Sequence, residues 1–422
     1  MGQRLVLSGG RLASGQKMDV AIDQAKGCIV EIGTIQLQSS DKLEDCRNMV
    51  ILPAPVELHA HLDKALLNQI LPIDVNPTGD LAGAIFAMQA IDLSPHNVFD
   101  RAKQAVIAMI QNGTTTIRSH VDVRDPIGTS SLKALIQLSS WLSATQLGTL
   151  QLACLMGRQL TGREGATNRA LLTESLELGV DVVGGCPYLD DSPQKALSIL
   201  LDAAAEAHLP VDLHTDETLD ANTLTLTDLL DEVERRGIGS GVNASHCVSL
   251  SMQTEKVQSE IAMRLAESGV SVTVLPQTNL YLQARGMSQG PPRGIAPAKL
   301  LKDAGVNVVA GADNVQDPFC PLGRLDALET ASLLILAAHF EPEVAWQACS
   351  NSPRKVLGLP EITFAIGDPA NLLVVSGNDV RSALSQANSD RIAIHGARVV
   401  SRTKVSTILD PDVDLSSARY TA

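Results

Sequence analysis

The chain has 422 residues, of which 45% are hydrophobic and 19% charged, with 31 glycines and 20 prolines. This composition excludes a disordered chain, a collagen and a small disulfide-rich scaffold. The length predicts one large domain with a smaller one, or two to three ordinary domains. The formal net charge is −14, no basic run stands out, and aromatic residues make up only 2%. We therefore expect neither nucleic acid nor a membrane surface as a partner.

Targeting and redox signals favour a cytoplasmic protein. No segment reaches the roughly 18 consecutive apolar residues that a membrane-spanning helix needs. The first residues, MGQRLVLSGGRLASG, lack the apolar core of a signal peptide. The seven cysteines are odd in number, scattered and never spaced as C-x-x-C. We expect reduced, buried thiols and a cytoplasmic location.

The central part of the chain repeats one unit eight times. Each unit is a short apolar run rich in β-branched residues, followed by a polar loop and in most cases a longer helical pattern. The runs are Met49–Ala54, Thr114–Val123, Thr149–Met156, Val180–Gly185, Pro210–His214, Gly241–His246, Val270–Leu275 and Val306–Gly311. The helical stretches are Asn97–Gln111, Lys133–Leu147, Arg169–Leu178, Gln194–Ala207, Thr225–Arg235, Glu255–Glu267 and Ala296–Asp303. Such alternation indicates parallel strands with helical crossovers, and eight repeats predict an α/β fold with a closed (β/α)8 TIM-like barrel.

The two ends of the chain differ from the centre. They read as short strands joined by turns, without a helical period, for example VAIDQAKGCIVEIG near the start and RIAIHGARVVSR near the end. We expect residues 1–53 and 365–410 to form one small β-sandwich beside a barrel of residues 54–364. Residues 411–422 read as a loose tail.

Histidines and carboxylates follow the predicted strands, at the end of a barrel where active sites are built. Five of the nine histidines fall there: His59, His61, His120, His214 and His246. His59 and His61 are two residues apart, so on a strand both rings point to one face. His214 and Asp313 would add a third nitrogen and an oxygen. The sequence therefore predicts a site for one Zn²⁺ or Fe²⁺, and the residue types do not choose between them.

Five segments of the sequence, which contain these histidines and Asp313, resemble segments of a known enzyme family. PAPVELHAHLDKALL, TTTIRSHVDV, VDLHTDET, ASHCVSL and AGADNVQDPF resemble, in order and spacing, segments of the cytosine deaminase-like branch of the amidohydrolase superfamily, near the triazine-pathway hydrolases. GDPANLLVV resembles a strand of the superfamily, with Asn371 in place of its Asp. The resemblance runs from about residue 3 to 402. It implies one metal ion and no carboxylated lysine, and the fourth strand indeed ends in Gly184-Gly185-Cys186-Pro187.

The resemblance also implies roles for single residues. His59, His61, His214 and Asp313 match the metal ligands, and Asp313 would also accept a proton from the attacking water. Glu217 matches the residue that carries protons to the leaving amine, and His246 the residue that orients and polarises water. His120 and Asp122 resemble the Thr-His-Val-Asp segment, with Ser119 in place of the Thr. They read either as support of the metal ligands or wall of the pocket, with His120 as a substrate contact, or as a plain structural pair.

At the positions expected to contact the substrate, this sequence differs from the family that it resembles. Cytosine deaminases present a Gln after the third strand, an Asp after the metal-binding Asp, and a Trp shortly beyond. Here Met156 or Gly157 falls at the Gln with Gln159 slightly later, Asn314 replaces the Asp, and Phe319 replaces the Trp. Gln283, Gln277 and Arg158 could supply other contacts. We therefore expect cytosine to be a poor substrate and a related ring a better one. The alternative is that Gln159 takes the missing role and cytosine is native.

These observations predict a metal-dependent hydrolase of a C–N bond in a small nitrogen heterocycle, with deamination of a cytosine-like ring as the first choice. Alternatives are a one-metal cyclic amide hydrolase, an N-dealkylating triazine-type hydrolase and, more remotely, a non-catalytic metal-binding barrel. The expected partner is a small heterocyclic substrate. The sequence does not determine the oligomeric state, and a homo-oligomer is one possibility.

Overall fold

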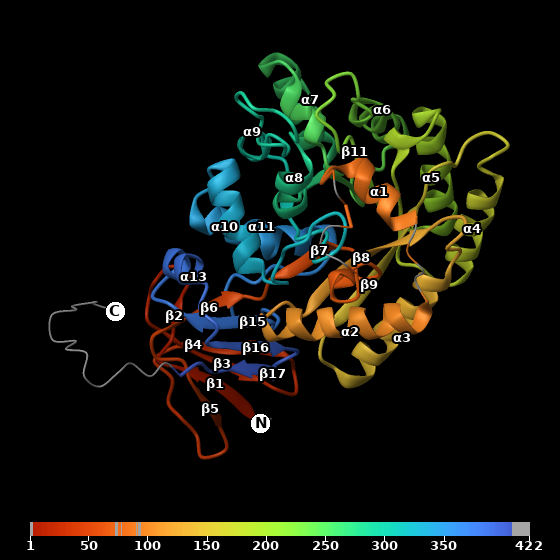
Figure 1. Cartoon of the computed structure of the whole chain (residues 1–422). Coiled ribbons are helices and arrows are strands. Elements are labelled where there is room, and N and C mark those ends of the chain that lie inside the picture. Colours follow the sequence, from red (N-terminus) through yellow and green to blue (C-terminus); the bar gives the residue numbers. More distant parts are fainter. Residues whose placement is uncertain (1–2, 72–74, 77, 90, 92–93, 407–422) are drawn as a thin grey trace, which may run out of the picture.

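The computed structural model describes residues 3–406 apart from 72–74, 77, 90 and 92–93. Its centre is an eight-stranded parallel sheet in the order β14-β13-β12-β11-β10-β9-β8-β7, rolled into a barrel (Figure 1). The strands are β7 (Val56–Ala60), β8 (Thr116–Val123), β9 (Thr149–Met156), β10 (Val182–Gly185), β11 (Val211–Thr215), β12 (Val242–His246), β13 (Ser271–Val274) and β14 (Val308–Ala310). The predicted (β/α)8 barrel is thereby confirmed.

Helices surround the barrel and follow its strands along the chain (Figure 1). They are α1 (Leu81–Gln89), α2 (Pro95–Gln111), α3 (Ser130–Thr145), α4 (Ala166–Glu177), α5 (Pro193–Ala207), α6 (Leu226–Arg236), α7 (Glu255–Ser268), α8 (Pro276–Leu282), α9 (Ala298–Asp303), α10 (Ala327–Ala338), α11 (Pro342–Cys349) and α12 (Asn351–Val356), with the short 3-10 helices η1 (Leu67–Gln69), η2 (Pro187–Leu189) and η3 (Val248–Met252). The seven predicted helical stretches are all present, with ends displaced by three residues or fewer. Among the described residues no helix is both long and apolar enough to cross a membrane.

The first predicted barrel strand is wrong. Met49–Pro53 forms β6, which pairs antiparallel with β15 (Leu372–Ser376) outside the barrel, and the barrel begins only at β7. Most residues from the start of β6 to the middle of β7 are apolar, so the sequence pattern does not show the break between the two strands. Pro53 and Pro55 flank that break, and a proline has no N–H to donate to a strand ladder. As a consequence, His59 lies inside the first barrel strand instead of after it.

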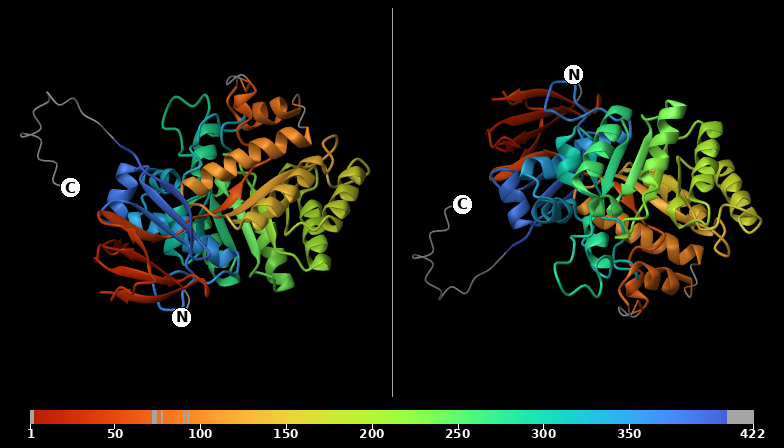
Figure 2. Two further views of the ribbon diagram at one scale, coloured as in Figure 1. Left: turned by 90° about the horizontal axis from the view of Figure 1, so that it is seen from below. Right: turned by 90° about the horizontal axis from the view of Figure 1, so that it is seen from above.

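Both chain ends contribute to two sheets at the flank of the barrel (Figure 2). One sheet has the order β4-β3-β1-β5 and the other β17-β16-β15-β6-β2. Leu7, Ile22, Ile51, Leu372 and Ile394 share one buried apolar cluster between strands of both ends. The remaining strands are β1 (Arg4–Ser8), β2 (Arg11–Leu12), β3 (Asp19–Asp23), β4 (Cys28–Gly33), β5 (Lys42–Asp45), β16 (Arg391–His395) and β17 (Arg398–Thr403). This is the small sandwich that the end segments predicted.

One helix in the C-terminal segment was missed. We predicted no helix there, but α13 (Val380–Gln386) follows β15. It spans only seven residues, which is too short for a visible apolar period. The Asp379 side chain accepts the Ser382 N–H at 2.7 Å, which caps the first turn. The predicted tail, 411–422, lies outside the described residues.

The cysteines are all free thiols, and five of the seven are buried.

A buried ion pair connects the flanking sheets to the barrel. It joins Arg391 of β16 to Asp326, the residue that caps α10, with Nη–Oδ distances of 2.7 and 2.9 Å. Because both groups are buried, each needs the other to offset the loss of water.

The barrel closes where its first and last strands meet. The two strands share a parallel bridge at Ala60 and Asp313, and the Asp313 N–H donates to the His59 carbonyl at 2.9 Å. The buried Glu57 carboxyl accepts two further N–H groups, from His59 at 2.9 Å and from Ala312 at 3.0 Å. A Cβ on Gly311 would lie 2.6 Å from Glu57 Oε1, so only glycine leaves room for this carboxyl. Glu57 therefore joins β7, which carries His59, to the loop after β14, which carries Asp313.

We expect Glu57→Ala to lower the free energy of unfolding by about 2–5 kcal/mol, because it leaves two buried N–H groups unpaired and a cavity behind. Chemical denaturation measures the loss. Glu234→Ala, at an exposed pair with Arg264, is the control and should change stability little. Equal stability of the two variants would show that the first and last barrel strands join without the help of Glu57.

Candidate metal centre and active site

Five predicted residues converge at the carboxyl end of the barrel. His59 and His61 come from β7 and the turn after it, His214 from β11, His246 from β12 and Asp313 from the loop after β14. All five are buried. The His59 ring centroid lies 5.3 Å from that of His61 and 4.6 Å from that of His214. The strand order thus brings together groups that lie up to 254 positions apart in the sequence.

The distances between donor atoms suit a metal ion. His61 Nε2 lies 3.2 Å from His214 Nε2 and 3.1 Å from Asp313 Oδ1, and His59 Nε2 lies 3.7 Å from the same oxygen. Ligand atoms of a tetrahedral site with bonds of about 2.0–2.1 Å are about 3.3 Å apart. His59 Nε2 and both Asp313 oxygens are buried without a hydrogen-bond partner among the described residues. The residues present therefore fit one divalent ion.

The protonation states agree with metal binding. Burial, reinforced by the neighbouring histidines, holds the pKa of His59 and His214 well below the ordinary value. Burial, followed by the nearby Lys64 ammonium, does the same for the pKa of His61. A histidine must be neutral to offer a nitrogen lone pair to a metal.

The orientation of His59 is set by a buried chain of polar groups. Ser245 Oγ donates to Asp212 Oδ1 at 2.9 Å, so its single hydrogen is used. It must then accept from His59 Nδ1–H, 3.0 Å away, which leaves the lone pair of Nε2 free on the side of Asp313. The other Asp212 oxygen accepts from Arg118 at 2.8 Å. Although burial alone would raise the pKa of Asp212, His120 and Arg118 outweigh it and lower the pKa to about 2.

His120 lies beside His59 and not in the wall of the cavity. Its ring stacks on His59 with centroids 3.9 Å apart, and His120 Nε2 lies 3.5 Å from Asp212 Oδ2. It does not line the cavity in front of the cluster, because β8 points it into the barrel interior. With His59 and His214 it forms a second group whose atoms lie within reach of one ion. Its position indicates support of the metal ligands, not contact with substrate.

Glu217 and His246 lie together beside the metal ligands. Glu217 Oε1 is 3.4 Å from His246 Nδ1, and Asn279 Nδ2 lies 3.0 Å from that oxygen and 3.2 Å from that nitrogen. Burial, followed by the charge of Asp313, raises the pKa of Glu217 well above its ordinary value. Burial lowers the pKa of His246 to about 4. A carboxyl with a raised pKa can hold a proton near neutral pH and release it again.

Asn279 was missed by sequence reasoning. It lies in α8, directly after β13, in the segment Pro276-Gln277-Thr278-Asn279. The sequence contains one sign of Asn279, which is the run of polar residues after a predicted strand. An amide side chain has no acid–base chemistry, so this sign does not single out Asn279 as a functional residue. Gln277 and Gln283 are predicted as further substrate contacts. Gln277 lies in α8 and donates to Thr330, and Gln283 donates to the Glu217 carbonyl at 3.3 Å.

Two functional residues hold strained backbone conformations. His246 has φ 70° and Asp313 has φ 64°, in the left-handed region that costs a residue with a side chain on the order of 1–2 kcal/mol. Both follow or end a barrel strand, where the chain turns away sharply. The surrounding hydrogen bonds hold this conformation, and it directs both side chains toward the shared cavity.

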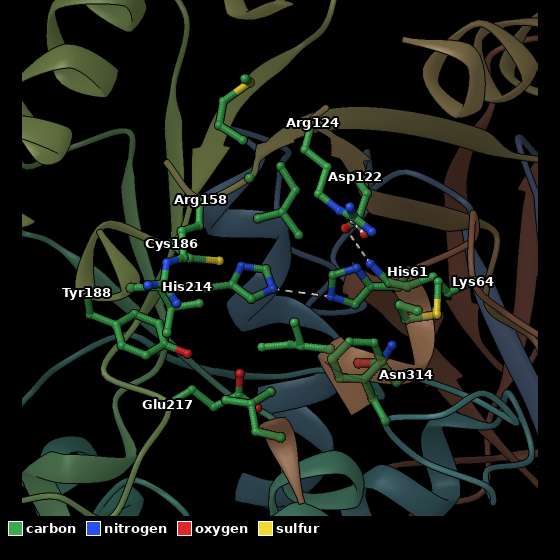
Figure 3. Close-up of a pocket in the computed structure, with 18 of the residues that line it drawn as sticks. His61, Lys64, Asp122, Arg124, Arg158, Cys186, Tyr188, His214, Glu217 and Asn314 are labelled. Carbon is green, nitrogen blue, oxygen red and sulfur yellow. Dashed lines mark hydrogen bonds and ion pairs between the residues drawn. The ribbon is translucent and has the colours of Figure 1, made fainter. Parts of the chain in front are cut away.

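A cavity of about 470 Å³ opens in front of the cluster (Figure 3). His61, His214, Glu217, His246 and Asp313 form its floor on one side. Of the predicted substrate contacts, Met156, Gln159, Asn314 and Phe319 line it, whereas His120 and Gln283 do not. Lining residues that carried no predicted role include Leu81, Ile85 and Met88 of α1, Lys64, Arg124 and Tyr188.

The polar groups of two predicted contacts are already engaged. Gln159 Nε2 donates to Asp191 at 2.5 Å at the cavity mouth. Asn314 Nδ2 donates to Asp317 at 2.7 Å, which leaves its carbonyl oxygen as the free acceptor. Gln159 thus lines the cavity with its amide nitrogen already bonded to Asp191.

Known proteins resemble this chain along most of its length. The model of the amidohydrolase family matches residues 99–411. A pterin deaminase of Rhizobium rhizogenes is 31% identical over 367 residues, with 85% of this chain and 82% of that protein covered. 5-Methylcytosine deaminase from Klebsiella pneumoniae liganded with 5-fluorocytosine superposes with a TM-score of 0.84 at 25% identity, covering 97% of this chain and 100% of that one. N-isopropylammelide isopropylaminohydrolase from Burkholderia multivorans shares the fold, with a TM-score of 0.80 at 23% identity and coverage of 95% and 98%.

The arrangement of donors predicts one divalent ion per chain. Elemental analysis of purified protein should find about one equivalent of Zn or Fe, and Asp313→Ala should lose most of it. His96→Ala, which removes an exposed histidine, is the matched control and should keep it. Two equivalents, or none after metal supplementation, would contradict the assignment.

Removal of the hydroxyl that orients His59 should weaken metal binding. We expect Ser245→Ala to lower metal affinity about 10- to 100-fold, measured by competition with a chelator. Ser249→Ala is the control, because its buried hydroxyl has no hydrogen-bond partner among the described residues. Unchanged affinity in Ser245→Ala would mean that packing alone orients the ring.

Proposed function

The chain belongs to the amidohydrolase family, and we propose that it deaminates an amino-substituted nitrogen heterocycle by hydrolysis. One observation carries the proposal: three of the four proposed metal donors, His61, His214 and Asp313, line the same cavity as the buried pair Glu217 and His246. A non-catalytic barrel would need neither Glu217 nor His246 in that place. The free thiols suit the cytoplasmic location that we also propose.

We assign the metal to His59, His61, His214 and Asp313, with Zn²⁺ or Fe²⁺ as the ion. Such an ion, when bound, acts as a Lewis acid and lowers the pKa of water toward neutrality. The four residues belong to three strands at the barrel rim, so the folded barrel presents them together.

The chain's own groups move the protons. Glu217 can take a proton from the attacking water at its carboxylate and pass it to the leaving amino nitrogen. His246 keeps Nε2 without a hydrogen-bond partner among the described residues, so this nitrogen can contact the water or the developing oxygen. Asp313 has a second buried oxygen that can accept a proton. Water and the amino-heterocycle give the oxo-heterocycle and ammonia.

Three observations favour a ring other than cytosine. The side chain that would replace the missing Gln, Gln159, is bound to Asp191. The cavity of about 470 Å³ falls in the size range of pockets for drug-sized ligands and offers more room than one small ring needs. The relative at 31% identity is named for pterin, a two-ring amino-heterocycle. We therefore place two-ring amino-heterocycles ahead of cytosine.

A substrate panel tests the proposal. Release of ammonia by metal-loaded protein should be measured with amino-pyrimidines, amino-triazines, creatinine-like rings, amino-purines and pterin. We expect at least one amino-heterocycle to be turned over, and cytosine to be poor. A kcat/KM for cytosine above about 10⁴ M⁻¹s⁻¹ would overturn the second expectation. No release from any ring by fully loaded protein would refute deamination.

Glu217→Gln should retain fold and metal but lose about 10²- to 10⁴-fold in rate, because the amide cannot carry the proton. Steady-state kinetics on the best substrate measure the loss. Glu260→Gln, an exposed change of the same kind, is the control. If Glu217→Gln kept near-normal turnover, another group would have to carry the proton.

A further inference from the structure

A buried ion pair forms part of the cavity wall beside the metal cluster. Lys64 lies in the turn that follows β7, where its backbone N–H donates to the His61 carbonyl at 3.0 Å. Its Nζ lies 2.5 Å from Oδ1 of Asp122, near the end of β8. Both side chains line the cavity, and Figure 3 shows them joined on one side of His61, with Glu217 toward the opposite side of the view.

The pair has hydrogen-bonding capacity that the protein does not use. A lysine ammonium has three N–H groups, and among the described residues only Asp122 accepts one within hydrogen-bond distance. The next carboxylate oxygen, on Asp63, is 3.9 Å away. For Asp122 Oδ2, the only basic nitrogen within 4 Å in the described part of the chain is Arg124 Nε, also at 3.9 Å. The wall therefore offers a free donor and a free acceptor side by side.

Such a pair is costly if it serves only to hold the turn. The Lys64 side chain is 3% exposed and the Asp122 side chain 14%. Two charges removed from water contribute little net stability, and an apolar pair of similar size is often as good. Charged groups at a cavity wall are instead typical of the few polar groups that orient a ligand.

The chemistry that matches this wall is a ring edge with a carbonyl next to an N–H. Its oxygen would accept from Lys64, and its N–H would donate to Asp122. At the position after β9 where cytosine deaminases read such an edge with a Gln, this chain has Met156 and Gly157, which cannot make those bonds. Phe319, whose ring centroid lies 5.7 Å from Lys64 Nζ, provides an apolar wall next to the pair.

We propose that Lys64 and Asp122 determine specificity by reading the cyclic amide edge, –C(=O)–NH–, of the substrate ring. The inference rests on the proposed function and deepens it. It restricts the substrate class to amino-heterocycles that also carry a ring carbonyl beside an N–H. Cytosine and pterin both carry this edge, so the size of the cavity, and not this edge, ranks two-ring substrates ahead of cytosine. The inference further implies that such rings bind with their amide edge toward β8 and their amino group toward Glu217.

Matched pairs of rings test the proposal. Isocytosine differs from 2-aminopyrimidine, and guanine from 2-aminopurine, by the oxo group and its neighbouring N–H. We expect metal-loaded wild-type protein to prefer the oxo ring of each pair in kcat/KM and in equilibrium binding. Lys64→Met and the isosteric Asp122→Asn should each reduce that preference about 10- to 100-fold. Lys133→Met, at an exposed ion pair with Glu174, is the control and should keep it.

The double variant Lys64→Met/Asp122→Leu removes both charges together, so neither partner is left buried and unpaired. A merely structural role would change stability or metal content and leave the preference between the two rings unaltered. That result in any folded variant overturns the proposal, as does a wild-type protein without a preference in both assays. Binding that prefers the oxo rings, without turnover of any panel member, would refute the proposed function and support the recognition role.

Discussion

The active site depends on how the barrel closes. Its first and eighth strands meet at a short seam, where Ala60 bridges to Asp313 and the Glu57 carboxyl accepts N–H groups from both sides. His59 and His61 stand on one side of this seam and Asp313 on the other. Since a parallel ladder has few bonds here, a buried carboxyl supplies what the backbone alone does not. Without this seam the histidines and the aspartate that we propose as metal ligands would not lie together.

Burial governs the electrostatics of the site. It lowers the pKa of His59, His61, His214 and His246 and raises the pKa of Glu217 and Asp313, so the neutral forms of these six groups are favoured. A divalent cation would reverse this for Asp313 by stabilising its carboxylate. The network of Asp212 and Ser245 then matters because it leaves one nitrogen of His59 free toward the same point. His246 and Asp313 have left-handed φ angles, which cost conformational free energy. The rest of the fold must offset this cost to keep the two side chains in place.

In the function that we propose, substrate recognition and hydrolysis use separate parts of the chain. The turn after β7 and the end of β8 provide Lys64 and Asp122, the loop after β14 provides Asn314 and Phe319, and α1 adds an apolar cover. The acid–base groups are held by β11, β12 and α8 instead. This division allows the ring-binding wall to change while the hydrolytic groups stay, which is the general way in which one barrel supports many substrates.

Much of this protein is determined by the sequence itself. Alternation of apolar runs and helical periods predicts the barrel, because each strand must be buried on both faces and each helix on one. The pattern H-x-H, followed by His214 and Asp313 after later strands, predicts the metal donors, since parallel strands end at one rim. Local patterns could not separate β6 from β7 inside one apolar run, nor reveal the seven-residue α13. Only the tertiary structure places His120 behind His59, ties Gln159 to Asp191, and brings Lys64 against Asp122 from 58 positions away. Those contacts are decided by strand order and side-chain direction, and neither is written in the spacing of any single segment.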